Sequence, residues 1–183
     1  KISMYKAHPI ILFLDEDFSE SAKYLTNKYL FANIKNCCQV LICAIFYNIG
    51  IRSKRIYKYY FCKERKTESL KKFFPNWPLK NIPNFVYYNS QESKWCRKCQ
   101  NHFDVILNYF SCLLDEYMYR FGHEHYLYDI LDFMQIAPME YTLNLGIKFS
   151  YINNLKITLP WKNLPVKYRK RNIIEGYRSY YNS

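Results

Sequence analysis

Two cysteines and a histidine recur at three-residue steps in Cys96-x-x-Cys99-x-x-His102, a spacing that can begin a zinc site. The surrounding residues predict a helix, on which such steps place the three side chains along one face. No second Cys-x-x-Cys is present, so Cys112 or His125 would have to complete the site. The alternative is a stripe of small side chains facing the core, and we therefore expect no metal and no cofactor.

Residues 115–125 contain acidic side chains, an arginine and two histidines close together in sequence. Glu116 and Arg120 are four residues apart, so on a helix they can form an ion pair, or in a buried cleft hold a phosphate or orient a base. Asp115 and Glu116 are adjacent and diverge, which argues against a glycosidase-type carboxylate pair. His123 and His125 either cap the carbonyls at the end of that helix or take part in a site.

Basic and aromatic side chains alternate near the C-terminus, where phosphates and bases could be contacted together. Cations neutralise phosphates, and tyrosine rings stack on exposed bases. The alternative is a terminal helix that docks its tyrosines on the core and leaves its charges in water. The candidate nucleic-acid-binding residues here are Lys167, Arg169, Lys170, Arg171, Tyr177 and Arg178.

The composition favours a polyanionic partner. The 183 residues carry 27 Lys and Arg against 15 Asp and Glu, a formal charge of +12, which suggests DNA or RNA, or less often an anionic membrane surface. Half of the residues are apolar, enough for one domain with a core. The adjacent Cys37 and Cys38 resemble buried free thiols. No secretory signal or membrane-spanning segment is recognised, so we expect an intracellular, reducing location: host cytoplasm, nucleus or virion.

The elements predict a mainly α, single-domain helical bundle over 1–183, with one short N-terminal strand and irregular basic loops. Residues 9–14 are predicted as the strand, with Asp17 or Ser19 capping the next helix. Helices are expected over 19–29, 31–48, 91–121 (one or two, ended by Gly122), 124–134 and 172–181. Residues 52–90 are predicted as a basic, proline-containing loop insertion, and residues 138–162 as irregular with a small hairpin.

Three stretches, within residues 14–41, 95–125 and 164–181, resemble a family of small phage and large-virus proteins. Some of its members are pyrimidine-dimer DNA glycosylases, and the chain is distantly similar to phage endonuclease V. The most specific pieces are Glu116-Tyr117-x-Tyr119-Arg120-x-Gly122-x-x-His125 and Tyr177-Arg178-x-Tyr180-Tyr181. The resemblance implies DNA as the partner and base excision as the ancestral activity. It also implies Gln39, Glu116 and His125 as candidate catalytic residues, and adds Lys28, Arg97 and Arg120 as candidate DNA contacts.

Several polar positions depart from the family pattern. The expected acid, imidazole, lysine and glutamate of the first helix pair are Asn27, Tyr29, Asn33 and Asn36 here. As the resemblance implies it, the chemistry needs a free terminal amine and a carboxylate, and the carboxylate would fall at Asn36. An amide cannot accept a proton or stabilise an oxocarbenium ion by charge. The inherited glycosylase mechanism is therefore expected to be lost.

Three hypotheses remain open at this point. The first is a virus-encoded nucleic-acid-binding protein, derived from a glycosylase, with lost or altered catalysis. The second is an active DNA glycosylase or lyase acting on damaged or modified bases with a rearranged site. The third is a structural or virion subunit whose tyrosine-rich surfaces contact protein partners.

Overall fold

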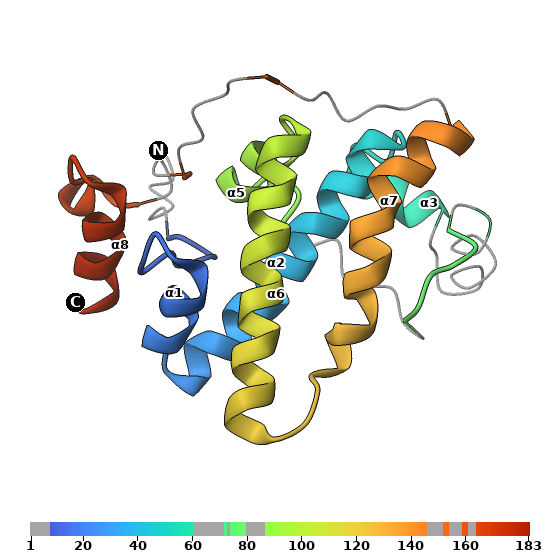
Figure 1. Cartoon of the computed structure of the whole chain (residues 1–183). Helices are drawn as coiled ribbons and strands as arrows, with labels where there is room; N and C mark the ends of the chain where they lie inside the picture. The colour runs from blue at the N-terminus through green and yellow to red at the C-terminus, as the bar shows by residue number, and fades with distance from the viewer. Residues whose placement is uncertain are drawn as a thin grey trace.

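Helices form almost all regular structure in the part of the chain that the computed structural model describes (Figure 1). That part comprises residues 8–60, 72, 74–79, 87–145, 152–153, 159–160 and 164–183, without the side chains of 60 and 138–145. The predicted mainly helical bundle is therefore confirmed. Most of the predicted hairpin region and the middle of the predicted 52–90 insertion lie outside the described residues.

The first two helices meet at a sharp break. Helix α1 (Phe18–Tyr24) begins at Asp17, whose carboxylate accepts from the N–H groups of Ser19 and Glu20. Helix α2 (Asn27–Asn48) follows after two residues. The helix predicted to run to residue 29 therefore ends five residues earlier, and the next begins four residues earlier than expected.

Helix α2 is the central element of the bundle. Its residues from Cys37 to Phe46 are buried without interruption. By length and composition α2 could cross a membrane, and 72% of its most apolar stretch is buried inside the protein. Most of the apolar surface of α2 is therefore covered by its neighbours.

Helix α6 (Gln100–Phe121) packs along both α1 and α2. Its face of Phe103, Ile106, Phe110, Leu113 and Leu114 is fully buried, as the three- and four-residue spacing predicts. Gly122 ends the helix with φ 72°, a left-handed conformation that glycine adopts without strain. The short helix α5 (Gln91–Cys96) precedes α6, so the region predicted as one or two helices contains two.

The predicted N-terminal strand is wrong, although residues 11–14 are buried. No strand is formed by the described residues, because the backbone of this segment bonds to helix side chains instead of to another strand. In alternate residues, the N–H groups of Ile10, Leu12 and Leu14 donate to Glu92, Asn33 and Ser21, and their carbonyls accept from Asn36, Tyr109 and Arg178. All six bonds measure 2.6–2.8 Å. Side chains thus replace a sheet partner.

Two regions predicted to be irregular contain helix. Helix α3 (Lys54–Tyr60) lies within the predicted loop insertion. After the turn η1 (Tyr126–Asp129), helix α7 (Ile130–Leu145) extends well beyond the predicted end at residue 134 and through Pro138. The buried residues Leu131, Phe133, Met134 and Ala137 all precede Pro138, and α7 contacts both α2 and α6.

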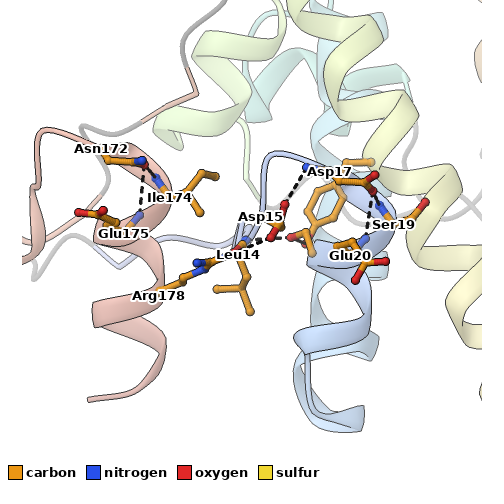
Figure 2. Close-up of polar contacts among 11 residues, drawn as sticks. Leu14, Asp15, Asp17, Ser19, Glu20, Asn172, Ile174, Glu175 and Arg178 are labelled. Carbon is orange, nitrogen blue, oxygen red and sulfur yellow. Dashed lines mark hydrogen bonds and ion pairs between the residues drawn. The ribbon is translucent and has the colours of Figure 1, made fainter.

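The C-terminal unit packs beside the N-terminal segment, although the two are far apart in sequence (Figure 1). The turn η3 (Val166–Tyr168) leads into α8 (Ile173–Tyr181). Asn172 caps α8 by accepting from the N–H groups of Ile174 and Glu175 (Figure 2). The predicted terminal helix is confirmed to within a residue, and this contact brings residues near both ends of the chain to one place.

Candidate nucleic-acid interface

A hollow of about 550 Å³ opens where the N-terminal segment, α2, η3 and α8 meet. Its wall is largely tyrosine, and we call it the tyrosine hollow. It is lined by His8, Leu12, Tyr29, Pro165, Lys167, Tyr168, Tyr180, Tyr181 and Ser183. Its size is in the range of sites that hold small planar ligands.

Hydrogen bonds and ring contacts hold the tyrosines in place. The Tyr180 hydroxyl lies 2.8 Å from His8 Nδ1, and Tyr181 Oη accepts from the Thr26 N–H at 2.9 Å. Tyr29 meets Tyr181 edge to face, with ring centroids 5.1 Å apart. The rings are thus arranged before any ligand arrives, which lowers the ordering cost of binding.

Two cations, on α2 and η3, lie against tyrosines of the hollow, and two more are exposed nearby in sequence. Lys167 Nζ lies 4.5 Å from the centroid of Tyr168, and its interaction with the phenol lowers the pKa of Tyr168. Lys28 is exposed at the start of α2, 6.0 Å from the centroid of Tyr29. Lys170 and Arg171 are exposed just beyond η3. These four predicted nucleic-acid-binding residues therefore have their charges in solvent.

Arg169 is exposed as well, but part of its guanidinium is engaged. Its Nε donates to the carbonyl of Leu164 at 2.8 Å, which fixes the turn before α8. Arg169 therefore braces η3.

Two predicted contacts of α8 serve the fold instead. Tyr177 is fully buried, packs against Phe13, and donates its hydroxyl to Pro160 O. Its buried ring offers no face on which a base could stack in this conformation. Arg178 donates to Leu14 O at 2.6 Å and to Asp15 at 2.8 Å, as Figure 2 shows. It ties α8 to the N-terminal segment.

Arg120 is engaged entirely within the protein. Its Nε pairs with Glu116 at 2.6 Å, so the expected i,i+4 ion pair is formed. Its other four N–H groups meet the carbonyls of Ala22, Lys23 and Leu25 and the amide oxygen of Asn27. A guanidinium has five donors, and all five are used at the end of α1. Arg120 therefore cannot donate to a phosphate while this helix end is intact.

Arg97 is also held by protein groups. Its guanidinium lies between the rings of Tyr47 and Tyr88, 4.4 and 4.5 Å from their centroids. It donates to the carbonyl of Tyr88 at 2.7 Å. Arg97 thus joins the end of α2 to the turn before α5, away from the tyrosine hollow.

The candidate catalytic residues do not converge. Glu116 is engaged by Arg120 beside Asn27, whereas Gln39 lies twelve residues farther along α2, a rise of about 18 Å. Gln39 is buried, and among the described residues its amide oxygen has no hydrogen-bond partner. His125 caps η1, where its Nδ1 accepts from the N–H of Leu127 at 3.1 Å. Gln39 and Glu116 thus lie apart, and Glu116 and His125 are each engaged in structural contacts.

The histidine at position 125 has a second structural contact. Its ring meets Tyr117 edge to face at 4.8 Å. Burial and the neighbouring His123 lower the pKa of His125. Because Nδ1 accepts a backbone hydrogen, the neutral ring carries its proton on Nε2. His125 thus caps the start of η1 and not, as the sequence suggested, the carbonyls at the end of α6.

The Cys96, Cys99 and His102 residues face the core. Both cysteines are buried, and His102 stacks on Trp95 with ring centroids 3.9 Å apart. His102 Nδ1 lies 2.8 Å from the Trp95 carbonyl, to which it donates. Burial raises the pKa of the Cys96 thiol well above its usual value, which disfavours the thiolate that binds zinc. Among the described residues, no three metal-ligating side chains gather.

Asn33 and Asn36 take part in the network around the N-terminal segment. Asn36 donates its amide N–H to Ile10 O at 2.6 Å, a bond that a glutamate carboxylate could not make. Asn33 accepts from Leu12 and donates to Tyr29 O. The amide at position 36 therefore has a structural role in the place where the family resemblance implies a catalytic acid.

Sequence reasoning did not assign His8 or Tyr29 to the interface. His8 contacts Tyr180 across 172 positions, and no local pattern signals such a contact. Tyr29 was recognised only as a departure from the family pattern. The burial of Tyr177 could have been predicted from helical periodicity, because Ile174 and Tyr177 share a helical face that is buried.

Comparisons of the chain with family models, with curated proteins and with solved structures found no match. The resemblance to dimer glycosylases therefore stays a prediction. The contacts, burial and charge of the described residues are what support a function.

Proposed function

We propose that this protein binds nucleic acid through the tyrosine hollow and the cations beside it. The observation that carries the proposal is the position of two exposed cations, Lys28 and Lys167, against preformed tyrosine rings. Lys170 and Arg171 are exposed three and four residues beyond Lys167 and add positive charge to the same segment. The rings come from three elements that are separate in sequence.

The two kinds of side chain have complementary tasks. Lysine and arginine attract the phosphates and release condensed counterions, which makes affinity dependent on salt. The Tyr29 and Tyr168 rings offer faces on which unstacked bases can lie, and stacking accepts any base. Single-stranded or locally opened nucleic acid is therefore the preferred form, because a closed duplex hides its base faces.

The proposed function does not include base excision. An excision reaction needs a group that accepts a proton or stabilises positive charge at the sugar. Asn36 donates to Ile10 O, and Glu116 is paired with Arg120. Neither group is available as a free carboxylate. Altered catalysis by other residues has no specific observation in its favour.

Fluorescence anisotropy with labelled single-stranded DNA, single-stranded RNA and duplex DNA tests the proposal. If the four cations each meet one phosphate, log K should fall with log salt concentration with a slope of about −3 for single strands. A Lys170→Gln, Arg171→Gln variant should lower that slope by about 1 to 2. The matched control is Lys94→Gln, Lys98→Gln, which removes two exposed cations near α5.

A second pair of variants tests base stacking. Tyr168→Ala removes a ring of the tyrosine hollow, and should cost about 1–3 kcal/mol in single-strand binding with little change in the salt slope. Tyr119→Ala removes a ring that is 85% exposed on α6 and serves as the control. Binding that is absent at low salt, or equal for all four variants, would refute the proposed interface.

A further inference from the structure

The end of α6 and the start of α7 carry charge opposite to that of the whole protein. Residues 115–145 contain six acidic residues and a single cation, Arg120, in a chain of formal charge +12. All donors of Arg120 are used inside the protein. The carboxylates of Glu124, Asp129 and Asp132 are exposed, and none is in an ion pair with a described residue. This surface is therefore locally negative.

Aromatic rings are exposed beside these carboxylates. Phe31 is 43% and Tyr126 is 69% exposed. The rings form a continuous series of contacts, because Tyr117 meets both Phe31 and His125, and His125 meets Tyr126 at 4.5 Å. We call this surface the acidic aromatic face, defined by Phe31, Tyr117, His125, Tyr126, Asp129 and Asp132. Exposed rings next to unpaired carboxylates are suited to a cationic partner, through cation–π contacts and ion pairs.

The chain itself offers a surface of matching chemistry at α3. Arg52, Lys54, Arg55 and Lys58 are all exposed, and no acidic residue occurs between positions 49 and 63. A hollow of about 650 Å³ beside α3 is lined by apolar side chains, including Ile49, Ile51 and Ile56. Such a hollow can receive an aromatic ring. Within one molecule these cations form no ion pair with the acidic aromatic face in the described structure.

We propose that the acidic aromatic face of one copy binds α3 and its neighbouring hollow in a second copy. The carboxylates of Asp129 and Asp132 meet Lys54 and Arg55 of the other molecule, and an exposed ring such as that of Tyr126 enters the apolar hollow. Nucleic acid and anionic membranes are repelled from this face by its charge. The contact leaves the tyrosine hollow free, so it does not depend on the proposed nucleic-acid binding.

Sedimentation velocity on the purified chain without nucleic acid tests this contact. At low salt, between about 1 and 100 µM, the wild-type protein should form species larger than a monomer, as expected for a modest interface. Two charge-reversed variants should each associate about tenfold or more weakly: Asp129→Lys with Asp132→Lys, and Lys54→Glu with Arg55→Glu. Circular dichroism and thermal melting establish that both variants are folded.

The decisive measurement is the equimolar mixture of the two variants. In either variant alone, the two surfaces that would meet carry charge of the same sign. In the mixture, every contact between one variant and the other joins a basic surface to an acidic one. Association should therefore return in the mixture and weaken again at high salt. Both variants keep a net positive charge, so attraction between whole molecules would not produce this result. A monomeric wild-type protein, or a mixture that stays monomeric, would overturn the proposal.

Discussion

The buried hydroxyl of Tyr109 gives the most direct test of how the N-terminal segment is held. The hydroxyl donates to Leu12 O at 2.6 Å and lies 3.0 Å from Ser21 Oγ. Tyr109→Phe removes this donor but keeps the ring, whose centroid is 4.9 Å from that of Phe13. The Leu12 carbonyl would then be buried without this bond, which costs about 1–3 kcal/mol. For a chain of this length, a loss of about 2 kcal/mol lowers Tm by about 4–8 °C.

Urea unfolding followed by circular dichroism measures this loss. Tyr119→Phe is the matched control, because Tyr119 lies on the same helix with its side chain 85% exposed, and it should change stability by less than about 0.5 kcal/mol. Adding Ser21→Ala to Tyr109→Phe should give a non-additive change, since both hydroxyls belong to one network. If Tyr109→Phe were as stable as Tyr119→Phe, the segment would not depend on side-chain hydrogen bonds in the way described.

Three further predictions address the candidate site residues and the buried thiols. Asn36→Glu loses the bond to Ile10 O, so it should lower stability by about 1–3 kcal/mol and release no base from irradiated DNA; base release at wild-type stability would contradict this. Burial lowers the pKa of His102, so the unfolded state binds a proton at this histidine more readily than the folded state does. The free energy of unfolding should therefore fall as the pH drops below about 6.5. His102→Gln should reduce that fall in urea titrations at several pH values, and an unchanged pH profile would count against this reasoning. Burial raises the pKa values of Cys38 and Cys43 to about 12, so a thiol reagent at pH 8 should label them no faster than the chain unfolds, and rapid labelling of the native protein would disprove the assignment.

The sequence alone predicts the structure correctly where local residue spacing determines that structure. The buried face of α6 and its end at Gly122 follow from helical periodicity and from the conformational freedom of glycine. The Glu116–Arg120 pair follows from the same periodicity. In these cases all the interacting groups lie within one or two turns of each other, so a single sequence contains the information.

The break between α1 and α2 could not be predicted in the same way. Neither glycine nor proline occurs there, and the backbone at the break is bound by distant side chains. Arg120 donates to the carbonyl of Leu25, and the Tyr181 hydroxyl accepts from the N–H of Thr26. The two helices therefore end and begin where tertiary contacts satisfy the backbone, which outweighs local helix propensity.

The role of the C-terminal cations could be predicted only in part. The basic run 167–171 is exposed, as its charge suggested. Arg178 is similar in type, yet it is bound to Leu14 O and Asp15. Charge alone does not distinguish a solvent-exposed cation from one that joins two segments of the chain. The difference lies in contacts between residues 163 or more positions apart.

The side-chain bonds around residues 9–14 also constrain the order in which the protein can fold. Leu14 is held by Arg178, and His8 by Tyr180, so these two contacts can form only after partners more than 160 positions later have been synthesised. Until then residues 8–14 lack these contacts, and closing so long a loop is entropically slow. The helical bundle can assemble earlier from neighbouring elements. The segment of residues 8–14 thus completes its native contacts later than the helices it packs on, and its apolar side chains are less well covered in the interval.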